Sequence, residues 1–197
     1  MFVQIMQGRT SDAEGLERQF ERWMSELAAG AGGWLGSTMG VSDDGRFIGI
    51  ARFRDEAAGQ ANSERAEQGS WWNETSKYFD GEVTFTNSTE VDDFRGGGSD
   101  SAGFVQVMQG RADKEQLRAL DRRFDELAPR PDLLGGLRVW HGDGQFVEAA
   151  YFSSEAEARE QESAEPPPEV AQLLEDWRKA MGDIQYVDLR QPWLYSP

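Results

Sequence analysis

The chain has 197 residues, and its 36 acidic and 20 basic side chains give it a formal net charge of −16. A molecule of this charge repels phosphate backbones, and no concentrated basic patch offsets the repulsion, so we expect no nucleic-acid partner. No apolar run approaches the ~20 residues of a membrane helix, and the absence of cysteine excludes disulfides and thiolate chemistry. Because 38% of the residues are hydrophobic and seven are tryptophan, we expect a soluble, cytoplasmic, globular protein without a membrane partner.

A tandem repeat determines how the chain is divided. Residues 2–9 read FVQIMQGR and residues 104–111 read FVQVMQGR, so seven of the eight positions are identical. Self-similarity of this kind is the signature of a duplicated structural unit. The Gly/Ser-rich stretch between the copies has the composition of a flexible linker. We therefore predict a first repeat at 1–95, a linker at 96–103 and a second repeat at 104–197.

Each copy begins with the pattern of a strand followed by a helix. The apolar run at 2–6 is typical of a short buried strand. Polar residues at 10–12 form an N-cap cluster, and apolar residues then recur at helical spacing over 16–27. The second copy repeats the pattern, with Leu117, Leu120 and Phe124 on its helix.

A hairpin and a second helix follow in each copy. An Asp-Gly turn precedes an apolar strand, which we place at 46–53 in the first copy. A helix is then expected from residue 55, and a final strand near 83–86. In the second copy these segments are expected at 145–152, from 154 and at 184–189, and the prolines at 166–168 must break or restart the helix.

The element order defines the fold class. Strand–helix–strand–strand–helix–strand is the ferredoxin-like unit, in which helices cover only one face of a four-stranded antiparallel sheet. In this order and in its duplication, the sequence resembles the dimeric α/β-barrel superfamily, which includes antibiotic-biosynthesis monooxygenases, as a tandem-repeat bacterial member. The resemblance implies an α+β fold in which two ferredoxin-like repeats pack their sheets together as an intramolecular barrel. Such a chain is a pseudo-dimeric monomer. Whether two such chains associate as a homodimer stays open.

The second helix of the first copy carries the most site-like segment. Helical spacing directs Trp72 toward the sheet, with Trp71 and Asn73 beside it and Asn62 earlier in the same region. In residue type, an asparagine, a tryptophan and the nearby Tyr78 resemble the pocket of cofactor-free monooxygenases, which hold a reduced phenolic substrate that itself reacts with oxygen. The alternative is that the two tryptophans are core and rim packing.

Three polar residues on predicted strands complete the candidates. Gln4 and Gln106 occupy the same position in the two copies, where they either donate hydrogen bonds to a ligand or bond to each other and to nearby backbone. Arg52 lies opposite to Phe53 on its strand. It either binds a carboxylate or phenolate or pairs with one of the many acidic groups.

Three functions remain open from the sequence. The first is binding of a small apolar or aromatic molecule in a cavity between sheet and helices. The alternatives are a cofactor-free monooxygenase acting on a quinol-like aromatic substrate, and a non-catalytic structural or interaction protein. We assign no catalytic residue and expect no cofactor and no metal site, since the chain has one histidine and no cysteine.

Overall fold

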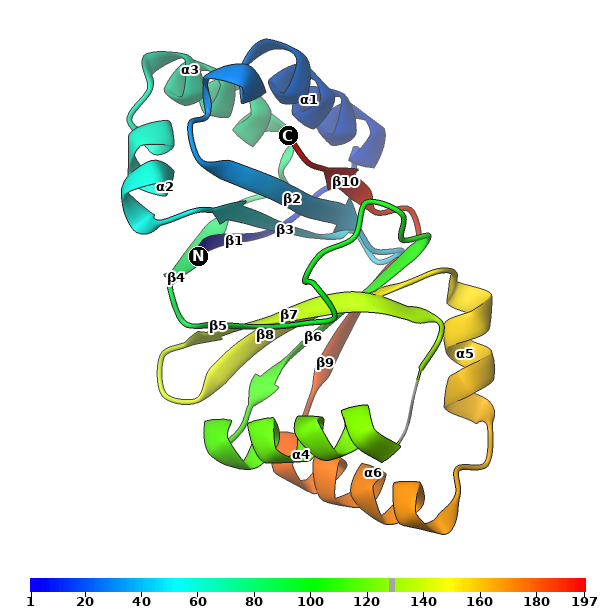
Figure 1. Ribbon diagram of the computed structural model, residues 1–197. Helices are drawn as coiled ribbons and strands as arrows, with labels where there is room; N and C mark the ends of the chain where they lie inside the picture. Colours follow the sequence, from blue (N-terminus) through cyan, green and yellow to red (C-terminus); the bar gives the residue numbers. More distant parts are fainter. Residues whose placement is uncertain (128–129) are drawn as a thin grey trace. The chain divides into compact units, whose positions relative to one another are not determined.

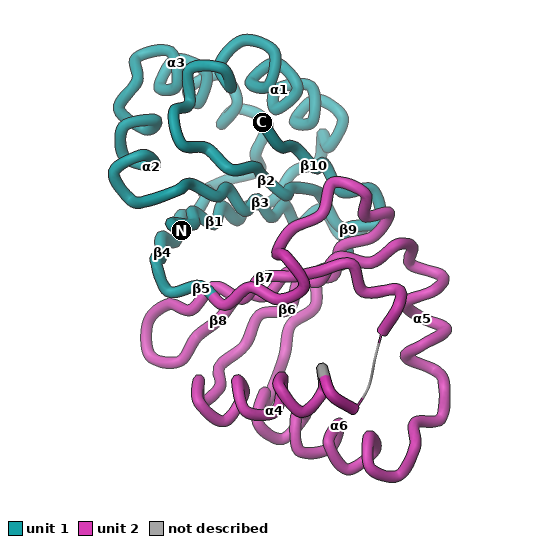
Figure 2. Tube along the Cα trace, in the orientation of Figure 1, with its two compact units in different colours: residues 1–91, 188–197 teal, residues 92–187 magenta. Residues whose placement is uncertain are grey.

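In the computed structural model, which describes residues 1–127 and 130–197, the chain divides into two units. The first comprises residues 1–91 and 188–197, and the second residues 92–187 (Figure 2). Each unit has one five-stranded antiparallel sheet with helices on one face (Figure 1). The α+β class and the tandem ferredoxin-like architecture are thereby confirmed. The bounds of the repeats and linker, and the packing of the sheets as a barrel, stay predictions.

The sheet of the first unit has the strand order β10-β2-β3-β1-β4. Its strands are β1 (Phe2–Arg9), β2 (Trp34–Val41), β3 (Arg46–Phe53), β4 (Thr84–Ser88) and β10 (Trp193–Tyr195). Its helices are α1 (Ala13–Glu26), α2 (Glu56–Ser63) and α3 (Ala66–Thr75), with short 3₁₀ turns at Ala28–Gly30 and Ser76–Tyr78.

Local sequence signals set the ends of these elements. The Asp12 carboxylate accepts a hydrogen bond from the Gly15 backbone N–H at 2.8 Å and caps α1. Asp55 caps α2 in the same way, also at 2.8 Å. Gly45 adopts a φ of +79° in the turn between β2 and β3, a conformation that costs glycine little. The first helix then buries Leu16, Phe20 and Trp23 in the core between helices and sheet.

The sheet of the second unit has the strand order β5-β7-β8-β6-β9. Its strands are β5 (Val91–Phe94), β6 (Phe104–Arg111), β7 (Leu133–His141), β8 (Gln145–Phe152) and β9 (Gln185–Leu189). Its helices are α4 (Lys114–Leu127), α5 (Glu155–Ser163) and α6 (Pro168–Met181). As predicted, the prolines separate two helices, because Pro168 stands in the first turn of α6, where its missing N–H needs no partner.

Each sheet has one strand more than the four expected from the sequence. Strand β5 follows β4 along the chain but pairs with β7, and β10 follows β9 but pairs with β2. These strands have four and three residues, too few for the alternation that predicts a strand. Each unit therefore takes its fifth strand from the chain segment that follows the other repeat. None of the described helices has the length and apolar character that a membrane span requires.

Candidate functional site

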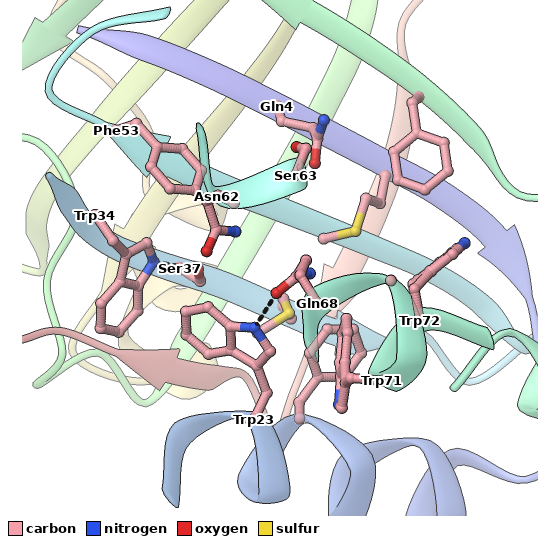
Figure 3. A pocket seen from close by; sticks show the side chains of 16 residues that line it. Gln4, Trp23, Trp34, Ser37, Phe53, Asn62, Ser63, Gln68, Trp71 and Trp72 are labelled. Atoms are coloured by element: carbon pink, nitrogen blue, oxygen red, sulfur yellow. Dashed lines mark hydrogen bonds between the residues drawn. The ribbon is translucent and has the colours of Figure 1, made fainter. Parts of the chain in front are cut away.

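A cavity of about 240 Å³ lies in the first unit, between the sheet and its helices (Figure 3). Its sheet side includes Gln4 on β1 and Met39 on β2, and its helix side includes Trp23 on α1 and Trp72 on α3. Sites for drug-sized ligands have volumes of ~300–1,000 Å³, so a molecule of one or two rings suits this space.

Aromatic side chains form most of the cavity wall. The rings of Trp23 and Trp34 meet edge to face with centroids 5.2 Å apart. Trp72 makes a similar contact, at 5.2 Å, with Phe85 on the edge strand β4, and Phe85 is 46% exposed. Edge-to-face arrangements of this kind are the geometry that aromatic pairs favour. The wall therefore offers faces and edges against which a further flat ring can pack.

The helix phase of α3 differs from the one expected. The sequence directs Trp72 inward with Trp71 beside it, but Trp71 is the buried ring, 4% exposed, and Trp72 is half-buried. The helix begins anew at Ala66 after α2 ends at Ser63, so its phase does not continue from the preceding helix. Both tryptophans nevertheless line the cavity.

Two indole N–H groups at the cavity are satisfied by side chains that also line it. Trp23 Nε1 donates to Gln68 Oε1 at 2.6 Å, drawn as the dashed line in Figure 3. Trp34 Nε1 donates to Ser37 Oγ at 3.0 Å. Buried polar groups need such partners, and these bonds fix the orientation of the side chains that accept them.

An asparagine contributes a second amide to the wall. Asn62 is buried on α2, and its Oδ1 accepts a hydrogen bond from Arg65 Nη1 at 3.1 Å. The same nitrogen donates to the Leu27 backbone carbonyl at 3.1 Å. Arg65 therefore ties the end of α2 to the end of α1 and holds Asn62 in place.

The cavity itself carries no charge. None of the residues that line it is acidic, basic or a histidine. The nearby Tyr195 phenol on β10 packs against the same core, and burial, aided by Glu21 and Glu17, raises its pKa to about 12. Among the described residues, no group of three or more histidine, aspartate or glutamate side chains is placed to hold a metal ion. The site can therefore position a ligand and exchange hydrogen bonds with it, but its lining provides no general acid or base.

The structure brings four of the seven predicted residues together: Gln4, Asn62, Trp71 and Trp72 all line the cavity. The Gln4 amide nitrogen donates to Asn87 Oδ1 on β4 at 3.2 Å, within its own sheet.

The other three predicted residues lie elsewhere. Asn73 is exposed on α3 and does not line the cavity. Arg52 lies against Gly36 on the opposite face of β3 from Phe53, and its buried Nε has no hydrogen-bond partner among the described residues. Gln106 is buried on β6 of the second unit, at the position equivalent to Gln4.

Sequence reasoning missed Trp34, Ser37 and Gln68 as site residues. Strict alternation places Trp34 and Ser37 on opposite faces of β2, but a register shift between Trp34 and Gly36 puts both on the cavity side. Gly36 has a φ of +129°, which only glycine adopts readily. A glycine inside the strand pattern was the signal for a bulge that the sequence offered. Nothing in the sequence singles out Gln68.

The second unit has different chemistry at the equivalent place. Register pairs Met39 with Gly49 in the first unit and Arg138 with Glu148 in the second. Arg138 is buried and bonds Glu148 Oε2 and Asp121 Oδ2, each at 2.6 Å. Burial raises the pKa of Glu148, and the Arg138 charge opposes this without cancelling it. An ion network therefore occupies the position that an apolar side chain holds in the first unit.

Comparison with known proteins places the fold. No protein-family model matches the sequence, and no curated protein matches it. A candidate monooxygenase from Lactobacillus acidophilus matches the structure with a TM-score of 0.73 at 12% identity, over 99% of this chain and 95% of that one. A candidate monooxygenase from Fusobacterium nucleatum matches with a TM-score of 0.74 at 6% identity, over 99% and 94%.

A third solved structure, described as an anthrone oxidase-like protein, matches with a TM-score of 0.65 at 11% identity, over 98% of this chain and 92% of that one. The chain has the tandem ferredoxin-like fold of these monooxygenase-like proteins. At such identities the likeness is one of fold, and at that level the resemblance stated from the sequence is confirmed.

Proposed function

We propose that the chain binds a small, uncharged aromatic molecule in the cavity of its first unit. The observation that carries the proposal is an aromatic wall, including Trp23, Trp71 and Trp72, around a space of about 240 Å³. A charged ligand would be desolvated there without an ionic partner, which is costly, whereas a flat neutral ring gains apolar and edge-to-face contacts.

Isothermal titration calorimetry with 2-naphthol tests this proposal. We expect saturable binding, and we expect Trp72→Ala to weaken it by about tenfold, since one aromatic contact with its buried area contributes ~1–2 kcal/mol. Trp177→Ala is the matched control, because Trp177 is also half-buried but lies on α6 of the second unit. Absence of binding to the wild-type chain, or equal loss in both variants, would reject the proposal and favour a structural or interaction role.

A second candidate function is cofactor-free oxygenation of a quinol-like aromatic substrate. Fold likeness to candidate monooxygenases and to an anthrone oxidase-like protein supports it. The uncharged cavity is compatible with a substrate that supplies its own electrons to oxygen. In a balanced reaction, 1,4-dihydroxynaphthalene and O₂ give 2-hydroxy-1,4-naphthoquinone and water.

Product analysis separates this reaction from simple autoxidation, which gives 1,4-naphthoquinone. With the wild-type chain we expect the hydroxylated quinone to form, and we expect its formation to be lost in Trp72→Ala and kept in Trp177→Ala. If only 1,4-naphthoquinone forms while 2-naphthol still binds, the chain is a binding protein without this activity.

A further inference from the structure

Two methionines flank one glycine on the sheet side of the cavity. Register places Met6 on β1 and Met39 on β2 against the two sides of Gly49 on β3. A Cβ added to Gly49 would lie 2.9 Å from Met6 Cε and 3.2 Å from Met39 Cγ, so both side chains occupy space that this glycine leaves. Both line the cavity, and the sulfur atoms are yellow in Figure 3. The sheet side of the cavity therefore carries two thioether groups.

The cavity gives small reagents a route to these thioethers. Ser63, Gly69 and Phe85 line the cavity and are exposed, so it opens to solvent beside them. Met6 and Met39 are only 7% and 3% exposed, and a space of about 240 Å³ lies next to them. A reagent of a few atoms can therefore reach two methionines that the fold otherwise buries.

The second unit provides an internal comparison. Met108 holds the position of Met6 in the second repeat and has the same exposed fraction, 7%. Register places Met108 opposite Glu148, whereas Met6 lies opposite Gly49. Arg138 Nε donates to Glu148 Oε2 at 2.6 Å, so a buried ion pair stands beside Met108. The two methionines match in position and exposure, and they differ in whether their neighbour leaves open space.

Thioethers react with hydroperoxides by transfer of one oxygen atom. The sulfur attacks one peroxide oxygen, so that an S–O bond forms as the O–O bond breaks. The other oxygen takes up the hydroxyl proton and leaves as water or as an alcohol. The sulfur is oxidised by two electrons and the peroxide is reduced by two, so no further reactant is needed. The product, methionine sulfoxide, is polar where the thioether was apolar.

We propose that Met6 and Met39 are the buried methionines that hydroperoxides oxidise first, and that their sulfoxides lower the affinity of the cavity for aromatic ligands. The second half of this proposal rests on the proposed function, and the first half does not. Sulfoxide oxygens on the sheet side would hold water that a neutral ring must displace. The oxidant can arise beside the protein, because a quinol that autoxidises with O₂ gives a quinone and hydrogen peroxide.

Timed treatment with hydrogen peroxide tests the first half on the wild-type chain without any ligand. Peptide mass spectrometry with fragmentation measures each sulfoxide and separates Met1 from Met6 on one tryptic peptide. We expect Met6 and Met39 to be oxidised about tenfold faster than Met108, since only they adjoin the cavity. Met1, at 42% exposure, gives the rate of an accessible methionine, and Met181, at 0%, gives that of a buried one. Rates at Met6 and Met39 no higher than at Met108 would overturn the proposal.

Calorimetry with 2-naphthol tests the second half. We expect the oxidised wild-type chain to bind about fivefold more weakly than the untreated chain. In the double variant Met6→Leu, Met39→Leu, which nearly conserves side-chain volume, peroxide should leave the affinity within about twofold of that variant's own untreated value. Met108→Leu is the matched control and should lose affinity on oxidation as the wild type does. An equal loss in the double variant would place the effect at other residues and overturn this half.

Failure of this inference and failure of the proposed function give different results. If 2-naphthol does not bind the untreated wild type, the proposed function fails and the second half fails with it, while the rates at Met6 and Met108 still decide the first. If 2-naphthol binds but those rates are equal, the proposed function stands and the oxidation site is refuted. The rate comparison uses the wild-type chain alone, so it does not depend on the folding of any variant.

Discussion

At one cross-strand position, β2 and β3 place Met39 opposite Gly49, whereas β7 and β8 place Arg138 opposite Glu148. The Arg138 guanidinium lies 5.6 Å from the centroid of the Trp140 ring, in addition to its bonds to Glu148 and Asp121. A buried ion pair offsets its desolvation only while every partner is present. The duplicated position thus lines a cavity in one unit and belongs to an internal ion network in the other.

Removing one partner from this network should lower the free energy of unfolding more than removing the pair does. We expect Glu148→Ala to lower the free energy of unfolding by ~3–5 kcal/mol, because Arg138 stays buried with only part of its charge compensated. The double variant Arg138→Met, Glu148→Ala should lose clearly less, since Asp121 is 36% exposed and can be hydrated. Urea unfolding followed by circular dichroism measures both. A double variant as unstable as the single one would contradict this account.

At the residue scale, the sequence predicted those cavity residues whose position follows from strand alternation or from helical spacing. Gln4 faces the helices by simple alternation on β1, and Trp71 and Trp72 were recognised from their place on a helix. The bulge in β2 hid Ser37, because one inserted residue inverts the faces beyond it. The pairing of Glu148 with Arg138 becomes evident only once the register of β7 with β8 is known.

One carboxylate of strand β5, that of Asp92, bonds the strand to helix α4 and to strand β7. Asp92 accepts hydrogen bonds from Arg118 Nε at 2.9 Å and from Trp140 Nε1 at 2.6 Å. Burial raises the pKa of Asp92, but the bonds from Arg118 and Trp140 outweigh burial and hold the pKa below its usual 3.8. Because the pKa is lower in the folded state, this contribution to stability is present above pH 3.8 and is lost as the pH falls through the folded value.

Replacing the carboxylate by an amide should remove this pH dependence. We expect Asp92→Asn to lower the free energy of unfolding by about 1–2 kcal/mol at pH 7, since solvent weakens the ion pair of this partly exposed carboxylate. Below pH 3 we expect the unfolding free energies of the variant and the wild type to differ by less. Asp93→Asn is the matched control, because Asp93 is the exposed neighbour on the same strand. Urea midpoints between pH 2.5 and 7 measure the effect. Parallel pH profiles for Asp92→Asn and the wild type would show that this carboxylate does not fasten β5.

Sequence reasoning at the element scale succeeded where turn chemistry and apolar pattern agree. The strands expected at 46–53 and 145–152 coincide with β3 and β8, since each follows an Asp-Gly turn and is long enough to show its pattern. Strands β5 and β10 have four and three residues, and each pairs far from its neighbours in sequence. Their pairing is determined by tertiary contacts, which local sequence does not encode.

For the whole molecule, strand β10 follows the second repeat in sequence but pairs with β2 in the sheet of the first unit. The first unit therefore depends on residues that follow the second repeat. Trp193 on β10 pairs with Met39 on β2 and is 7% exposed. Its ring centroid lies 6.0 Å from that of Phe20 and 6.1 Å from that of Phe47, in the core beside the cavity. Contacts between residues so far apart in sequence form late, because a long loop must close first. The first unit can therefore be completed only after the second repeat has been synthesised.

Deleting residues 191–197 tests this dependence, because it removes β10 and leaves β9 intact. Loss of a buried tryptophan alone costs ~3–5 kcal/mol, and loss of the strand also leaves the edge of β2 unpaired. We expect faster hydrogen exchange in β2 and α1, weaker binding of 2-naphthol, and unchanged exchange in β7 and β8. Deleting only the exposed residues 196–197 should have no such effect. Unchanged exchange in β2 after the longer deletion would show that the first unit is complete without the chain end, and the cavity would then belong to residues 1–91 alone.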